Sequence, residues 1–341
     1  MKTVLLIAGG GTLGSYTTLE LLKMGHKVDV IALEELTSYN KNLTYIRRRV
    51  DDEFLTELLN EKHYDAIVDF LHYPDMEVFQ PRFRLLSDHT DRYVFLSSYR
   101  VFANEEIPIR ETSPQLLDVY GENELLSLDT YGIRKSYGER YIRASGRKNW
   151  TIIRPLISFS KFRFDLVTLG GLHLFPRTDG RPVILPADAK DKVCGLGWAG
   201  NVGKLIAGLI FSPAAVCEDF NVGNDENLTW GQIASIYEEV MGLRFVWVSS
   251  EDYLSACTSN RASDRVILYY DRLFDRRIDN TKVLEATGTS REEMIGFREA
   301  LIRELQQLSD DPNAVKRFTD TEVSKRINKQ MDDWLTAHGM M

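Results

Sequence analysis

Short apolar runs alternate with segments of helical periodicity along the first 155 residues. The first run, residues 4–8, is continuously apolar, as in a parallel strand buried on both faces of a sheet. Residues 16–24 carry leucines on one face and are followed by Gly25, which predicts a helix that ends at a glycine, and residues 53–60 predict a second helix. Further strand-like runs lie at residues 27–33, 43–46, 65–71, 93–97 and 150–153. This alternation predicts βαβ units and an α/β fold with a Rossmann-type, doubly wound parallel sheet.

The pattern changes after Arg154 and Pro155. Residues 158–195 carry glycines, prolines and basic side chains with weak periodicity, and helical segments follow at residues 201–211, 229–241 and 290–308. We therefore expect a dinucleotide-binding sheet domain formed by residues 1–155 with the interleaved residues 190–225. A smaller C-terminal α/β lobe for the substrate is expected from residues 156–190 and 226–341.

Composition narrows the class of protein. The 341 residues include 42 basic and 50 acidic side chains, a net charge of −8, which argues against a nucleic-acid partner held by phosphate contacts. The three cysteines form no CxxC pair and the six histidines no HExxH motif, so no metal site is expected. No apolar run approaches the roughly 20 residues of a membrane span. These features predict a soluble, cytoplasmic protein with no membrane partner.

A glycine-rich turn follows the first strand and opens the first helix. In this turn Gly9, Gly11, Thr12, Leu13 and Gly14 would let the backbone approach a pyrophosphate, which the free N–H groups and the dipole of a helix N-terminus favour. An acid that would select the adenosine ribose is missing from the end of the second strand, where the sequence has Ala32 and Leu33 and then Glu34 and Glu35. The basic triplet at residues 47–49 could bind the 2′-phosphate of NADP or could simply lie on the solvent-exposed surface. The choice between NAD and NADP therefore stays open.

A tyrosine, a lysine and a serine form the candidate catalytic set. Tyr131 and Lys135 lie four residues apart in a helical segment and therefore share a face. An ammonium beside a phenol lowers its pKa from about 10 toward a working range for proton transfer. Ser98 follows the strand at residues 93–97, at the sheet edge where open α/β sheets place ligands.

In these motifs the sequence resembles the extended short-chain dehydrogenases/reductases, the NAD-dependent epimerase/dehydratase family that includes sugar-nucleotide epimerases. The likeness covers most of the chain and rests on several motifs. These are AGGGTLGS at residues 8–15, GHKV at 25–28, SSYRVF at 97–102, the Tyr131/Lys135/Glu139 spacing, Arg154-Pro155, NVG at 221–223 and RIDNTK at 277–282.

The resemblance implies a bound NAD or NADP and a small-molecule substrate that is a nucleotide sugar or a related carbohydrate. Tyr131 would be the acid/base, Lys135 would also bind the nicotinamide ribose, and Leu71 would contact the cofactor. Arg177 and Arg181 lie where members often contact a substrate diphosphate. Members also form homodimers through two helices. In this chain the candidates for these two helices are residues 77–86 and 131–143.

Departures from the family pattern refine the expected reaction. Ala8 stands in place of the first glycine, Arg49 in place of an adenine-contacting Asp, and Asn201 in place of another Asp. Dehydratase relatives carry Asp-Glu where this chain has Tyr99-Arg100, so epimerase or simple dehydrogenase/reductase chemistry is favoured. The alternative is a catalytically idle protein with the same fold, either a dinucleotide sensor or an RNA-binding relative.

Overall fold

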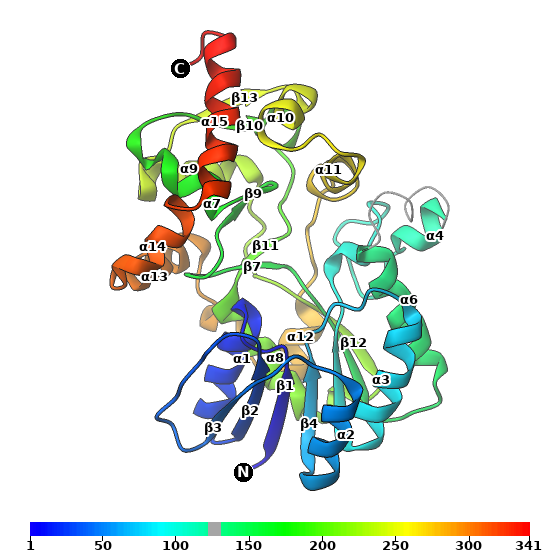
Figure 1. Cartoon of the computed structure of the whole chain (residues 1–341). Coiled ribbons are helices and arrows are strands. Elements are labelled where there is room, and N and C mark those ends of the chain that lie inside the picture. Colours follow the sequence, from blue (N-terminus) through cyan, green and yellow to red (C-terminus); the bar gives the residue numbers. More distant parts are fainter. Residues whose placement is uncertain (122–130) are drawn as a thin grey trace.

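The computed structural model describes residues 1–121 and 131–341, in which a parallel sheet carries a smaller lobe above one end (Figure 1). The sheet has seven strands in the order β12-β6-β5-β4-β1-β2-β3, and every pair is parallel. The strands are β1 (Thr3–Ile7), β2 (Lys27–Ala32), β3 (Leu43–Arg47), β4 (Tyr64–Asp69), β5 (Thr90–Leu96), β6 (Trp150–Pro155) and β12 (Glu218–Val222). This topology confirms the predicted Rossmann-type sheet.

The central strands are apolar on both sides because helices cover both faces of the sheet. Along β1, Val4 and Leu6 belong to one buried cluster, whereas Leu5 and Ile7 belong to another on the opposite face. The first cluster receives side chains from α1 (Thr12–Lys23), α8 (Ala199–Ile210) and α12 (Thr281–Thr287). The second receives them from α2 (Asp52–Glu61), α3 (Met76–Asp88) and α6 (Tyr131–Ala144).

The order of the strands reverses between β1 and β4. The chain moves outward from β1 through β2 to β3, and then returns to place β4 on the other side of β1. In doubly wound sheets this reversal opens a crevice at the carboxyl ends of the strands, where ligands bind. The glycine-rich turn, the end of β4 and the end of β5 all lie at this edge.

The smaller lobe has its own apolar core, which includes Trp230, Tyr253 and Phe297. Its strands are β8 (Asp165–Leu166), β9 (Leu169–Gly170), β10 (Val183–Pro186) and β13 (Phe245–Val248), and β7 (Ile157–Phe159) pairs with β11 (Leu196–Trp198) between the lobe and the sheet. Its helices are α7 (Gly171–Leu174), α9 (Trp230–Met241), α10 (Ser250–Cys257), α11 (Ala262–Ile267), α13 (Phe297–Ser309), α14 (Pro312–Thr319) and α15 (Glu322–Ala337). One further helix, α4 (Leu116–Tyr120), lies beside α6.

The chain passes between sheet and lobe more often than the sequence analysis predicts. The predicted lobe includes all of residues 226–341, but α12 packs on α8 and β12, and its Val283 and Leu284 join the core of the sheet domain. The single helix expected at residues 290–308 is divided into a 3-10 turn (Arg291–Glu293) and α13. The backbone N–H of Ile295, between these two elements, donates to the side-chain oxygen of Asn201 on α8.

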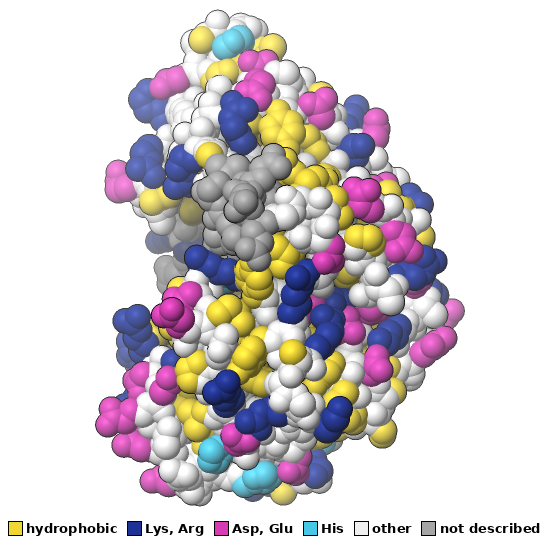
Figure 2. Space-filling view, turned by 90° about the vertical axis from the view of Figure 1, so that its right-hand side faces the viewer, with side chains coloured by type: hydrophobic (Ala, Val, Ile, Leu, Met, Phe, Trp, Pro, Cys, Tyr) yellow, Lys and Arg dark blue, Asp and Glu magenta, His cyan; other side chains and the backbone are white. Residues whose placement is uncertain are grey.

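The two helices considered for a dimer lie side by side on the outer face of the sheet domain. Figure 2 shows this side of the molecule, where charged side chains are interspersed with small groups of apolar ones. Exposed positions include Arg84 on α3 and Arg140 on α6, and Pro81 stands within α3 without ending it. A homodimer through this face stays a prediction. No helix among the described residues is both long and apolar enough to cross a membrane.

Candidate active site

The glycine-rich turn joins β1 to α1 in a conformation that side chains would obstruct. A Cβ on Gly14 would lie 2.2 Å from the carbonyl oxygen of Gly9, so the turn and the helix pack directly against each other. A Cβ on Gly11 would meet no atom within 4 Å, because this position faces open space. Ala8 adopts a positive φ of 57°. The turn therefore leaves the N-terminus of α1 accessible to an anion.

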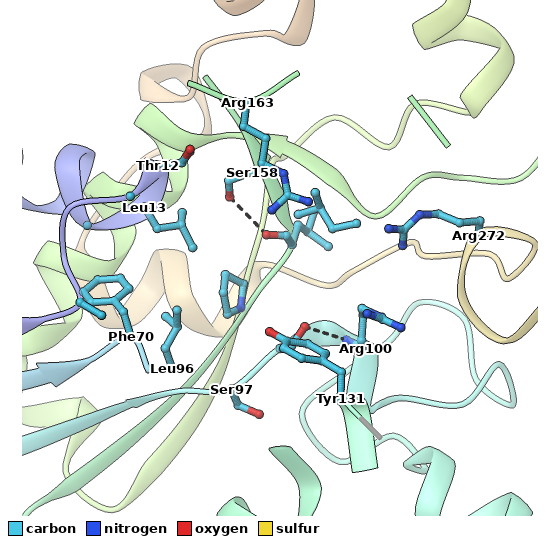
Figure 3. A pocket seen from close by; sticks show the side chains of 17 residues that line it. Thr12, Leu13, Phe70, Leu96, Ser97, Arg100, Tyr131, Ser158, Arg163 and Arg272 are labelled. Carbon is cyan, nitrogen blue, oxygen red and sulfur yellow. Dashed lines mark hydrogen bonds between the residues drawn. The ribbon is translucent and has the colours of Figure 1, made fainter. Parts of the chain in front are cut away.

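A cavity of about 460 Å³ lies at the carboxyl ends of β1, β4, β5 and β6 (Figure 3). It brings together Ser98, Tyr131 and most of the predicted cofactor residues, namely Gly11, Thr12, Leu13 and Gly14. Its remaining walls are Ala8, Phe70, Leu96, Ser97, Arg100, Pro155, Leu156, Ile157, Ser158, Arg163 and Arg272. Gly9, Leu71 and Lys135 lie outside this lining. Gly9 packs in the turn, where a Cβ would lie 2.8 Å from the Cβ of Leu6.

Two adjacent serines at the end of β5 have different roles. Ser98 is buried and its hydroxyl oxygen accepts a hydrogen bond from the backbone N–H of Arg100 at 3.2 Å, which fixes the hydroxyl at the cavity wall. The Ser97 hydroxyl instead donates to Glu139 on α6 at 2.5 Å. One serine is therefore placed for a ligand, and its neighbour ties the strand end to the helix.

Tyr131 begins α6 and projects into the cavity beside Arg100 (Figure 3). The guanidinium carbon of Arg100 lies 5.1 Å from the centre of the phenol ring. The ring of His72 lies 5.2 Å from it, centre to centre. A cation next to the ring stabilises a phenolate relative to the neutral phenol. From the sequence alone, Arg100 marks only a departure from the dehydratase pattern.

Lys135 lies one turn behind Tyr131 and is buried. Its ammonium donates to the carbonyl oxygens of Leu96 at 2.6 Å and Leu71 at 3.0 Å. Burial lowers the pKa of Lys135 to about 8, against the opposing effects of Asp69 and Glu139. Leu71, predicted to contact a cofactor, thus contributes its carbonyl group to holding the lysine.

A buried ion pair fixes α6 to the sheet. Two guanidinium nitrogens of Arg154 on β6 donate to the two carboxylate oxygens of Glu139, at 2.8 and 2.7 Å, and both side chains are fully buried. Gln115 donates to the same carboxylate at 3.0 Å. Burial by itself would raise the pKa of Glu139, but the positive charge of Arg154 and the bond from Ser97 hold this pKa below its usual range.

Basic side chains surround the part of the cavity that faces the lobe. Arg272 and Arg163 line this cavity and also a second one of about 430 Å³, so the two hollows share a wall. The second cavity is further lined by Arg261 and Arg326. No sequence signal marked Arg272 as a site residue, because only the fold of the lobe brings it to the sheet edge.

Glu34 supplies a carboxylate beside the glycine-rich turn. A Cβ on Gly10 would lie 2.7 Å from its Oε2 atom, and Glu34 lines a hollow together with Gly10 and Gly11. Two arginines of the basic triplet at residues 47–49 contact protein groups instead of this hollow. Arg47 pairs with Glu35 at 2.9 Å, and the Arg48 guanidinium lies 4.5 Å from the centre of the Phe54 ring.

Arg177 and Arg181 do not line the cavity beside the glycine-rich turn. Arg177 is fully buried, donates to the side chain and backbone of Asn328, and pairs with Asp332 at 2.7 Å. Arg181 pairs with the same Asp332 and with Asp179. The expectation that they contact a substrate diphosphate does not fit this position, because both guanidinium groups bind α15 to the rest of the lobe. Among the residues described, no cluster of His, Cys, Asp and Glu could hold a metal ion.

Comparison with solved structures identifies proteins of the same fold. An epimerase from Methanothermobacter thermautotrophicus aligns over 93% of this chain and 94% of its own, with a TM-score of 0.68 and 16% identity. A UDP-glucose-4-epimerase from Stenotrophomonas maltophila with bound NAD and formylated UDP-arabinopyranose covers 91% and 98%, with a TM-score of 0.66 and 14% identity. UDP-glucuronic acid 4-epimerase from Bacillus cereus, in complex with UDP-glucuronic acid and NAD, covers 90% and 99%, with a TM-score of 0.65 and 14% identity.

At this level of identity the likeness establishes the fold, which is the one that the motif resemblance implied. No protein-family model and no curated protein matches the sequence. The assignment of a reaction therefore depends on the geometry of the cavity.

Alanine substitutions at two glycines of the turn should differ in their effect on stability. Gly14→Ala should destabilise the protein by about 1–3 kcal/mol, because the new methyl group would overlap the Gly9 carbonyl. Gly11→Ala should unfold at nearly the wild-type urea concentration, because its methyl group enters open space. Equal stabilities of the two variants in urea unfolding would contradict this description of the turn.

Glu139→Gln should cost about 3–5 kcal/mol of stability, because it leaves Arg154 buried with less compensating charge. The matched control is Glu239→Gln, which breaks an exposed pair with Arg298 and should leave the stability close to that of the wild type, because solvent screens an exposed pair. Urea unfolding of both variants measures the difference. Similar losses would show that burial does not distinguish the two pairs.

Proposed function

We propose that the protein is an NAD-dependent enzyme that oxidises and re-reduces a hydroxyl-bearing carbon of a nucleotide sugar, as an epimerase does. The observation that carries the proposal is that one cavity contains the hydroxyls of Ser98 and Tyr131 and the open N-terminus of α1. The structural neighbours include nucleotide-sugar epimerases crystallised with NAD. A sensor would need the anion-binding turn but not this pair of hydroxyls.

The residues present fit a dinucleotide. Gly11 leaves the space for a pyrophosphate that a Cβ would occupy, and the first backbone N–H groups of α1 point to that space. Glu34, beside Gly10, offers a carboxylate for the adenosine ribose hydroxyls, where it would repel a 2′-phosphate. This arrangement favours NAD over NADP. The cofactor supplies a hydride acceptor and donor when bound.

The protein's own residues would handle the proton and the position of the sugar. Tyr131 would take the proton from the reacting hydroxyl and return it, and Ser98 would hold the same oxygen by a hydrogen bond. Arg100 and the buried ammonium of Lys135 would favour the phenolate form of Tyr131. An epimerase must also let the oxidised sugar turn, so that hydrogen returns to the opposite face of the carbon.

A nucleotide sugar would span the two hollows, which share a wall that includes Arg163 and Arg272. The sugar would occupy the cavity beside Tyr131, and the nucleoside would extend into the second cavity. The diphosphate between them would lie near Arg163 and Arg272, which line both hollows. This assignment replaces the earlier expectation for Arg177 and Arg181.

Tyr131→Phe should lower the turnover of UDP- or GDP-linked sugars roughly 100-fold or more, because no phenol remains to transfer the proton. NAD affinity, measured by calorimetry, should stay near wild type. The matched control is Tyr141→Phe on the same helix, whose hydroxyl accepts from Arg84 at a distance from the cavity, and which should keep full turnover. An active Tyr131→Phe protein, or a wild type that binds NAD but transforms none of these sugars, would contradict the proposed function.

The rate should fall as the pH rises through about 8. Lys135 has a pKa of about 8, so it is charged below this pH and neutral above it, and a neutral lysine no longer stabilises the phenolate. The pH dependence of kcat with saturating substrate measures this limb. A rate that stays constant between pH 7 and 10 would show that the charge of Lys135 is not required.

A further inference from the structure

A buried carboxylate at the end of β4 has no part in the mechanism described above. Asp69 is fully buried and accepts three hydrogen bonds from neutral donors. These come from the Tyr73 hydroxyl at 2.6 Å, the Tyr93 hydroxyl at 2.8 Å and the backbone N–H of Leu71 at 3.0 Å. Neutral donors stabilise a carboxylate without cancelling its charge, so these three partners leave the charge of ionised Asp69 uncompensated.

Leu71 connects this carboxylate to the buried lysine. Its N–H group donates to Asp69, and its carbonyl oxygen accepts from the ammonium of Lys135 at 3.0 Å. The orientation of one short backbone segment is therefore fixed by an acid on one side and by a cation on the other. The second support of the ammonium is the Leu96 carbonyl at the end of β5, and the ammonium lies 4.8 Å from the centre of the Phe95 ring.

Two carboxylates act electrostatically on Lys135, and they differ in how far they are neutralised. Glu139, on the same helix, forms a bidentate pair with Arg154. Asp69, on β4, is bonded to phenols and an amide. Arg82 on α3 also acts on it electrostatically, and the Arg82 guanidinium lies 5.8 Å from the centre of the Tyr73 ring. His72 and Tyr131 also face this region.

Burial and charge act on Lys135 in opposite directions. Burial favours the neutral amine and lowers the pKa of Lys135, and Asp69 is the first of the two groups that oppose this effect. Burial likewise raises the pKa of Asp69, and Lys135 opposes that shift. Each buried group therefore stabilises the charged form of the other.

We infer that Asp69 is a positioning residue: it fixes the Leu71 segment that holds the Lys135 ammonium, and it keeps that ammonium charged at neutral pH. The effect of Asp69 on the charge of Lys135 is a property of the protein without cofactor and does not depend on the proposed function. Only the effect on catalysis rests on the proposed function. Through that effect, Asp69 sets the upper pH limit of the reaction.

The test is Asp69→Asn, which keeps the size of the side chain and removes its charge. In cofactor-free protein labelled with ¹³C at the lysine ε-carbon, the Lys135 signal is identified by its loss in Lys135→Met. Its titration midpoint should fall by about one pH unit or more in Asp69→Asn, because the protonated lysine loses a neighbouring negative charge. The alkaline limb of kcat should move to lower pH by the same amount.

The matched control is Asp29→Asn. Asp29 is also a buried strand carboxylate that accepts from a tyrosine, Tyr64 at 2.7 Å, but it lies on β2 beside Lys62. This variant should lose stability and leave the Lys135 midpoint unchanged. Tyr93→Phe, which removes a donor but keeps the Asp69 charge, should also leave the midpoint near its wild-type value.

An unchanged Lys135 midpoint in folded Asp69→Asn would overturn the inference. If Asp69→Asn does not fold, Asp69→Ser takes its place, since its hydroxyl can still accept from the Leu71 N–H, and the same result would overturn the inference. Failure of the proposed function would give a different result. The titration midpoint of Lys135 would still depend on Asp69, but the wild-type protein would transform no nucleotide sugar.

Discussion

Helix α6 carries Tyr131 and Lys135, and its position depends on the buried pair between Glu139 and Arg154. The pair joins α6 to β6, and the bond from Ser97 to the same carboxylate adds the end of β5. Ser98 is covalently next to Ser97, so the hydroxyl at the cavity wall and the phenol on the helix share one anchor. Two charges removed from water are stabilised here because each is bonded in a bidentate geometry.

Charge is organised in two layers around this anchor. Behind the cavity, Glu139 pairs with Arg154, and Leu71 lies between Asp69 and Lys135. In front, Arg100, Arg163 and Arg272 line the hollow, and carboxylates hold all three: Arg100 and Arg272 pair with Asp271, and Arg163 pairs with Asp165. A protein with a net charge of −8 thus lines its cavity with guanidinium groups, which composition alone could not show.

Much of the sheet domain could be predicted because its signals are local. Apolar runs and glycine positions are read over a few residues, and the spacing of Tyr131 and Lys135 follows from one helix. The placement of Ser98 needed only the rule that parallel strands end at one edge of the sheet. The roles of Arg177 and Arg272 could not be predicted, because they depend on how segments more than 100 residues apart meet. The inward orientation of Lys135 is also a tertiary effect, set by the Leu96 carbonyl at the end of β5 and the Leu71 carbonyl just after β4.

The late return of α12 to the sheet has a consequence for how the chain folds. Strand β12 and helices α8 and α12 are made after the first segments of the lobe, yet they complete one face of the sheet and its edge beyond β6. A nascent chain that has reached only residue 155 would therefore expose β6 as an open edge, along with the apolar surface of β1 and α1. The core of the sheet domain can be completed only after nearly 290 residues have been synthesised. The strands up to β6 and the later elements β12, α8 and α12 must therefore fold together as one cooperative unit.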